Sequence, residues 1–161
     1  MTPDSLSRRQ LLTLTGSAAA AAALASLSLT GCSDRYKLRC QHQRTGEVYR
    51  ELNIEIGSVI THSWIHSIEL SRWTDIYRFD GETLMLTSTE FEAYGAGMPL
   101  DEGDVSVQDG QVVIENIDRE FEAIRWIHSH RVDYRIGVDG DESLIDTDAL
   151  PDLEPLELRP K

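Results

Sequence analysis

The chain has 161 residues, and its 28 acidic against 15 basic side chains give a formal net charge of −13 at neutral pH. So much negative charge repels the phosphate backbone of nucleic acids and argues against them as partners. Lysine occurs only at Lys37 and Lys161, and an acidic, lysine-poor surface stays hydrated in concentrated salt, so we expect a halophilic source.

Residues 1–31 have the pattern of an export signal. Arg8 and Arg9 stand directly before an apolar, alanine-rich run from Leu11 to Leu29, and paired arginines ahead of such a run indicate the twin-arginine export route. The alternative is a membrane-spanning helix, which needs about 20 strongly apolar residues. Serine and threonine side chains dilute this run, so an export signal is the better interpretation.

The signal ends in Leu29-Thr30-Gly31-Cys32, which resembles a lipobox, the motif in which the cysteine thiol receives a diacylglycerol and becomes the new N-terminus. Each buried methylene of a lipid contributes about 0.8 kcal/mol, so two acyl chains on Cys32 would hold the protein at a membrane. We therefore expect a lipid-anchored protein on the outer face of the cytoplasmic membrane, with residues 32–35 as a tether. Cys40 is then left without a cysteine partner, and we expect a buried thiol in a domain without disulfides.

Residues 36–146 carry β-strand signals almost throughout. Apolar and polar residues alternate from Leu52 to Ile56, and "RTG" separates this segment from an earlier β-rich run, which predicts an opening hairpin. Asp-Gly pairs at 80–81, 109–110 and 139–140 favour three further tight turns. The spacing predicts about eight or nine short strands in an all-β fold, either an antiparallel β-sandwich or a small barrel. Residues 147–161 hold three prolines and many acids, and we expect an acidic tail that is extended or partly disordered.

Five histidines raise the question of a metal site, which strand geometry limits. His62 and His66 are four residues apart, which on a strand is about 13 Å and too far for one ion to bridge. His128 and His130 are two residues apart, about 7 Å between α-carbons, which a metal could bridge. Neither pair has a complete ligand set, so we expect structural or surface histidines, and the question of a metal stays open.

The segment Gly95-Ala96-Gly97 could form a ligand cradle or a corner. It lacks the third glycine and the following helix of a dinucleotide fingerprint, and the lysine of a P-loop is missing. Two glycines and Pro99 at the end of a β-rich run are what a sharp turn requires. We therefore expect a corner and no cofactor.

The segment "HSIELSRWTDIY" followed by "FEAYGAGMP" resembles the family named domain of unknown function 1850. Members show His-Ser-Val-Glu, an acidic residue soon after, and then Phe-x-x-aromatic-Gly-Ala-Gly-x-Pro. The matching positions of this chain are His66, Ser67, Ile68, Glu69, Asp75, Phe91, Tyr94, Gly95, Ala96, Gly97 and Pro99. Arg72 stands where the family usually has proline, and Asp75 where it usually has glutamate.

The resemblance covers residues 36 to 146 and implies a small exported protein, of a kind often encoded beside TRAP-type transporters with TAXI-type solute-binding components. It implies an accessory role in solute uptake, by association. Because the two motifs flank the hairpin at residues 80–81, they could converge at one end of the sheet. The candidate binding cluster consists of His66, Ser67, Glu69, Asp75, Glu90, Tyr94, Gly95 and Gly97. The alternative is that the motif only preserves folding geometry.

The expected function is a lipid-anchored, extracytoplasmic binding or accessory module without catalysis. Its expected partners are membrane lipid, through Cys32, and a TRAP-type transporter subunit. A metal-dependent enzyme that uses His66 with nearby carboxylates is the first alternative, and a purely structural envelope protein is the second. A complete ligand cluster would favour the enzyme, whereas an apolar-lined pocket with a few polar groups would favour the binding module.

Overall fold

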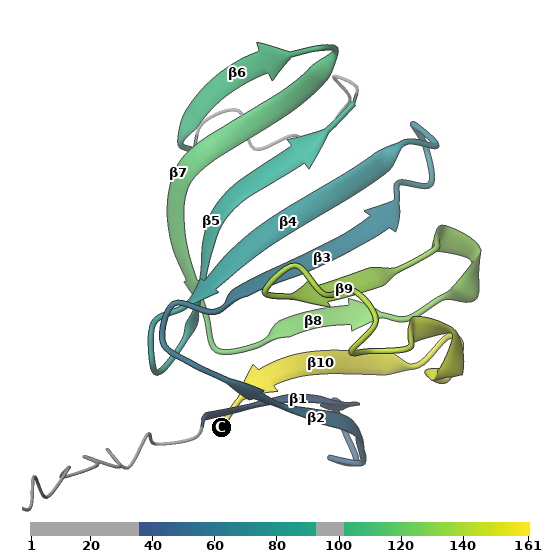
Figure 1. Cartoon of the computed structure of the whole chain (residues 1–161). Helices are drawn as coiled ribbons and strands as arrows, with labels where there is room; N and C mark the ends of the chain where they lie inside the picture. The colour runs from purple at the N-terminus through teal and green to yellow at the C-terminus, as the bar shows by residue number, and fades with distance from the viewer. Residues whose placement is uncertain (1–35, 93–101) are drawn as a thin grey trace, which may run out of the picture. The chain divides into compact units, whose positions relative to one another are not determined.

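The alternating segments form ten β-strands in two antiparallel sheets, one of four strands and one of six (Figure 1). This structure, a computed structural model, describes residues 36–92 and 102–161. The predicted all-β class is confirmed, with ten strands in place of eight or nine. Of the two predicted forms, the pair of sheets is that of a sandwich.

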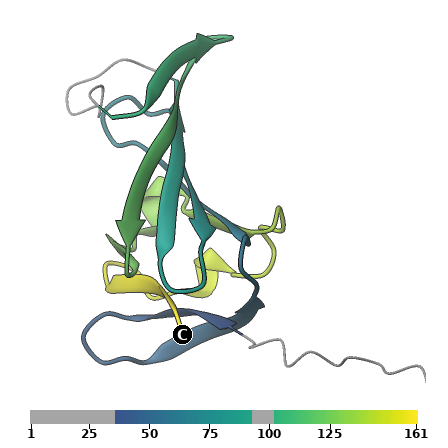
Figure 2. The ribbon, with the colours of Figure 1, turned by 90° about the vertical axis from the view of Figure 1, so that its left-hand side faces the viewer.

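The smaller sheet has the strand order β2-β1-β10-β8. Its strands are β1 (Tyr36–His42), β2 (Val48–Ile54), β8 (Ile124–Ile127) and β10 (Pro155–Pro160). The predicted opening hairpin is confirmed, because β1 and β2 pair antiparallel along their length. Figures 1 and 2 show this hairpin and the turn between β6 and β7 at opposite ends of the described domain.

The larger sheet has the strand order β6-β7-β5-β4-β3-β9. Its strands are β3 (Val59–Ile65), β4 (Arg72–Phe79), β5 (Leu84–Phe91), β6 (Asp104–Gln108), β7 (Gln111–Phe121) and β9 (Arg135–Val138). Two single 3-10 turns, η1 (His130–Val132) and η2 (Thr147–Ala149), lie in the connections around β9.

The three Asp-Gly pairs turn the chain as predicted, though the third does not join two strands. Asp109 and Gly110 both have positive φ, 51° and 87°, as a tight hairpin requires, and they connect β6 with β7. Asp80 begins the connection of β4 with β5, where its carboxylate accepts hydrogen bonds from the backbone N–H groups of Glu82 and Thr83. After Asp139 only a single bridge follows, so no second strand pairs with β9 there.

The main core lies between the two sheets. Leu38, Cys40 and Leu158 from the smaller sheet pack in one cluster with Ile60 and Phe79 from the larger. Cys40 is fully buried and free, as predicted, and burial raises its pKa to about 12. A second, smaller cluster of buried residues, formed by Phe91, Val112 and Ile114, comes only from β5 and β7 of the larger sheet.

The predicted tail is part of the fold, so the boundary at residue 146 was wrong. Strand β10 lies between β1 and β8 and pairs with both, and Leu156 and Leu158 are fully buried in the main core. Prolines stand at both ends of β10, where they remove few ladder hydrogen bonds. The acidic residue at its centre, Glu157, is neutralised by basic neighbours.

The predicted export signal and lipid anchor, with Arg8, Arg9 and Cys32, lie outside the described residues. In the part of the chain that the structure describes, no helix has the length and apolar character needed to cross a membrane.

Candidate functional site

The inner face of the larger sheet carries a row of aromatic rings. Trp64 of β3 lies opposite Trp73 of β4, which lies opposite Phe91 of β5. The two indoles stack with centroids 6.0 Å apart, and Trp73 stacks on Phe91 at 4.4 Å. The result is a continuous aromatic floor over three neighbouring strands.

A carboxylate lies one row further along the same face. Asp75 of β4 pairs with Thr89 of β5, and its Oδ1 accepts hydrogen bonds from Thr89 Oγ1 at 2.7 Å and from Trp73 Nε1 at 3.0 Å. Tyr77 donates its hydroxyl to Oδ2 at 3.3 Å. Burial raises the pKa of Asp75 above its usual value, although these three hydrogen bonds and the charge of Arg119 work against the increase. Asp75 is therefore an oriented acceptor in a partly desolvated position.

These residues line a pocket of about 320 Å³. Its walls consist of Trp64, Trp73, Asp75, Leu86, Thr89, Glu102, Ile117 and Arg119. Arg119 Nη1 lies 3.2 Å from the carboxylate of Glu102, so the lining of the pocket includes an ion pair besides the aromatic floor. The size and the mixture of aromatic, apolar and few polar groups fit the usual character of a small-molecule site.

A bulge in β5 decides which side chains reach this pocket. Leu86 pairs with Tyr77 and Ser88 with Ile76, so Thr87 is an extra residue without a ladder partner on β4. The bulge reverses the alternation, and Thr89 faces the pocket together with Leu86. Without it, Thr89 would point to the opposite face.

The first family motif forms the turn that joins β3 to β4. His66 Nδ1 contacts a carboxylate oxygen of Glu69, and the backbone N–H of Leu70 donates to the carbonyl of His66. Leu70 has φ 55°, which is uncommon for a leucine. The His66 ring lies 5.7 Å from that of Trp73, so this turn contacts the aromatic floor of the pocket.

The structure brings together only part of the predicted cluster. His66, Glu69 and Asp75 are linked through Trp73, but Ser67 is exposed in the turn. Glu90 follows Thr89 on a strand and therefore points to the opposite face of the sheet. Tyr94, Gly95 and Gly97 lie outside the described residues, so the predicted corner is not described.

Of the eight residues that line the pocket, the sequence analysis predicted only Asp75. It missed the other seven, namely Trp64, Trp73, Leu86, Thr89, Glu102, Ile117 and Arg119. The sequence could have predicted the orientation of the two tryptophans. Side chains two residues apart on a strand share a face, so Trp64 faces the same way as His62, and Trp73 faces the same way as Asp75. The orientation of Arg119 could not be predicted in this way. Arg119 lies opposite Leu86, but residues 116–118 before it are irregularly paired, so the alternation of faces along β7 is interrupted there.

His128 and His130 bind the backbone of a later segment of the chain. His128 is fully buried, accepts a hydrogen bond from Trp126 Nε1 and donates its Nε2 hydrogen to the carbonyl of Thr147 at 3.0 Å. His130 Nε2 lies 2.9 Å from the carbonyl of Leu150. Both fasten the connection between β9 and β10 to the domain. Within residues 36–92 and 102–161, no three His, Cys, Asp or Glu side chains are grouped so that they could hold a metal ion.

The family model of a domain of unknown function (DUF1850) matches residues 60–144, just over half of the chain. The chain belongs to this family. The DUF1850 match includes every residue that lines the pocket, whereas β1, β2 and β10 lie outside it. No curated protein and no solved structure matches the chain.

Proposed function

We propose that this DUF1850 protein is a lipid-anchored, extracytoplasmic binding module that receives a small solute in the pocket on the inner face of the larger sheet. The observation that carries the proposal is the meeting of the aromatic floor of Trp64 and Trp73 with the oriented carboxylate of Asp75. The paired arginines Arg8 and Arg9 and the lipobox-like Cys32 support export and anchoring.

The pocket favours a solute with an apolar body and a cationic or N–H group. Indole faces attract cations and stack on flat apolar groups, and Asp75 supplies a negative acceptor next to them. Three donors already fix Asp75 in place, so the carboxylate is oriented before a ligand arrives, which reduces the entropic cost of binding.

Tryptophan fluorescence gives a direct test, because two of the three tryptophans of the chain line the pocket. A panel of small amines, amino acids and carboxylates is titrated into the protein, and we expect a cationic or zwitterionic member to change the emission. Asp75→Asn should weaken that response at least tenfold. Glu90→Gln is the matched control, since Glu90 lies close by on the outer face of the same sheet. Equal weakening by both variants would contradict the pocket.

The family resemblance supports an accessory role beside a TRAP-type transporter. We expect a transporter subunit to co-purify when the lipidated protein is captured from solubilised membranes. The Cys32→Ser protein, captured in parallel, shows whether the association needs the anchor. If no solute from the panel binds and no subunit co-purifies, the purely structural envelope protein becomes the better proposal.

A metal-dependent enzyme is the remaining alternative, and its strongest candidate ligands are His66 and Glu69. These two side chains contact each other in the turn. Titration with Zn²⁺, followed by thermal melting, tests this alternative. A metal-dependent rise in melting temperature that His66→Ala abolishes would favour the enzyme over the binding module.

A further inference from the structure

The outer face of the smaller sheet gathers basic side chains. Leu38 and Cys40 of β1 point into the core, so Lys37 and Arg39 point outward. By the same alternation, Arg159 of β10 and Arg125 of β8 also face outward, since their strand neighbours Leu158, Ile124 and Trp126 are buried. We call Lys37, Arg39, Arg125 and Arg159 the basic face.

The basic face contains like charges in direct opposition. Arg39 lies opposite Arg159 in the register of β1 and β10, an arrangement that destabilises a sheet unless other charges offset it. The acidic residues in the paired register of this face are Glu51 and Glu157. Glu51 contacts Lys37 at 3.6 Å and Arg39 at 2.6 Å. Four basic against two acidic side chains leave a local charge of +2, in a chain whose net charge is −13.

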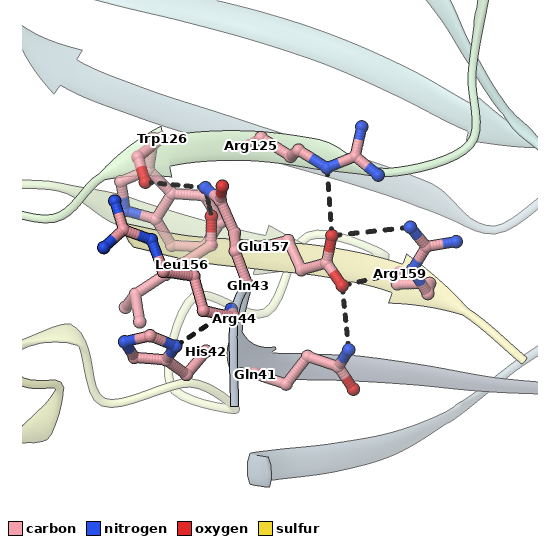
Figure 3. Close-up of polar contacts among 9 residues, drawn as sticks. All are labelled: Gln41, His42, Gln43, Arg44, Arg125, Trp126, Leu156, Glu157 and Arg159. Carbon is pink, nitrogen blue, oxygen red and sulfur yellow. Dashed lines mark hydrogen bonds and ion pairs between the residues drawn. The ribbon is translucent and has the colours of Figure 1, made fainter. Parts of the chain in front are cut away.

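Glu157 lies between two arginines of the basic face, and Figure 3 shows its carboxylate in contact with Arg125, Arg159 and Gln41. It is 4% exposed, and it accepts hydrogen bonds from Arg125 at 3.0 Å, from Arg159 at 3.1 Å and from Gln41 at 2.8 Å. Burial alone would raise its pKa, but these three donors outweigh burial and hold the pKa below its usual value. Each arginine has five N–H donors, and the side chains of Arg125 and Arg159 remain 49% and 28% exposed. Both guanidinium groups are therefore fixed in position and still accessible from outside.

The position of this face in the chain indicates what it meets. Lys37 follows Cys32 by five residues, and an extended chain of that length spans at most about 18 Å. A lipid on Cys32 would therefore keep the basic face within reach of the headgroups in which that lipid is inserted. This step rests on the proposed lipid anchor.

We propose that the basic face docks on anionic phospholipid headgroups of the membrane that holds Cys32. Headgroup phosphates accept the charge-assisted hydrogen bonds that arginine and lysine donate. Because the anchor already holds the basic face near the headgroups, docking requires no long-range electrostatic attraction. Direct ion pairs between the basic side chains and the phosphates can therefore form even where concentrated salt shortens the Debye length to about 3 Å. Docking would hold the smaller sheet toward the bilayer and set the orientation of the domain.

Lysine labelling tests the docking directly, because Lys37 belongs to the basic face and the chain has only one other lysine, Lys161. The two exchange backbone hydrogen bonds where the central strands β1 and β10 of the smaller sheet begin and end. The lipidated full chain is reconstituted into vesicles of phosphatidylcholine alone or with one third phosphatidylglycerol. An amine-reactive reagent is added, and the modification rate of Lys37 is read by peptide mass spectrometry. We expect labelling to be slower in the anionic vesicles by about fivefold, the factor that about 1 kcal/mol per basic residue produces.

Charge variants distinguish docking from a general effect of the vesicles. Arg39→Gln should remove most of the protection of Lys37. Arg78→Gln removes the same charge from an exposed position on the larger sheet and should leave the protection intact. Thermal melts of both variants confirm that they are folded. Equal labelling in the two kinds of vesicle, or equal loss of protection in both variants, would overturn the docking proposal.

The same experiment separates failure of docking from failure of the anchor. If the full chain does not float with either kind of vesicle, the lipid anchor itself is wrong. If it floats with both and Lys37 labels equally fast in both, the anchor stands and the docking proposal falls.

Discussion

The imidazole of His66 contacts the carboxylate of Glu69 three residues later, across the turn that joins β3 and β4. The His66 ring also lies against Trp73, which donates its indole hydrogen to Asp75. The family motif is thereby connected to the pocket through one tryptophan. His66 and Glu69 hold the turn, and Trp73 and Asp75 are part of the lining of the pocket.

The contact between His66 and Glu69 is expected to stabilise the fold, and replacing either residue should remove the same stabilisation. His66→Ala and Glu69→Ala should each lower the free energy of unfolding by about 1–2 kcal/mol, since either change leaves a half-buried partner unpaired. The double variant should lose little more than the larger single loss, because both changes remove the same contact. Urea unfolding of the three variants measures this. Fully additive losses would show that the two side chains stabilise the fold independently.

The charge of Asp75 is expected to lower the stability of the fold at neutral pH, whereas its hydrogen bonds raise it. Its raised pKa means that the folded state favours the protonated form, so the stabilising effect is present at low pH and is lost as pH rises through the raised pKa. Asp75→Asn keeps the shape and removes the charge, so at pH 7 its stability should equal or exceed that of the parent. Asp75→Ala should lose about 1–3 kcal/mol, because Trp73 and Thr89 lose their acceptor. Denaturant unfolding at pH 4 and pH 7 tests both variants, and a clear loss in Asp75→Asn at pH 7 would contradict the argument.

His62 predicts sensitivity to acid. Its ring is buried among Trp126 and Tyr134, and burial together with the nearby His128 lowers its pKa to about 3. The pKa of histidine in the unfolded chain is near 6.5, and above that pH the lowered pKa of His62 costs the folded state nothing. As pH falls from 6.5 toward 3, the free energy of unfolding decreases by up to about 1.4 kcal/mol per pH unit. His62→Phe should reduce the slope of stability against pH in that range. An unchanged slope would mean that other groups cause the acid sensitivity.

Gly103 predicts a backbone requirement next to the pocket wall. It has φ +71°, and a Cβ atom there would lie 2.2 Å from the carbonyl oxygen of Glu115 on β7. Gly103→Ala should therefore displace β6 and cost more than the roughly 1–2 kcal/mol of positive φ alone. Gly110→Ala is the matched control, since Gly110 has φ +87° but nothing within 4 Å. Equal losses of stability in the two variants would show that the contact with Glu115 adds nothing.

The net charge of −13 predicts a dependence on salt. Repulsion among the excess acids should destabilise the fold in dilute buffer and relax as the Debye length shortens to about 3 Å at 1 M. The melting temperature should rise between low and molar salt. If it stays constant, the expected halophilic source loses its support.

The sequence by itself determined the local structure. Asp109-Gly110 specified a hairpin because both positions can take positive φ, and the alternation from Leu52 to Ile56 specified the second strand of the opening hairpin. The burial of Cys40 also followed, because a lone thiol in a half-buried strand packs as a small hydrophobe. These features depend on neighbours within a few residues, which the sequence shows directly.

Only the tertiary structure decided the place of β10 and the composition of the pocket. Leu156 and Leu158 stand among prolines and acids, and their burial depends on pairing with β1, more than 110 residues earlier in the chain. Glu90 was expected in the cluster because it stands next to the second family motif, and Thr89 was not expected there. Simple alternation along β5 would also place Glu90, and not Thr89, on the face of Leu86. The extra residue Thr87 reverses that alternation. A single-residue bulge exchanges the two faces of a strand, and only the pairing with the neighbouring strands shows where it lies.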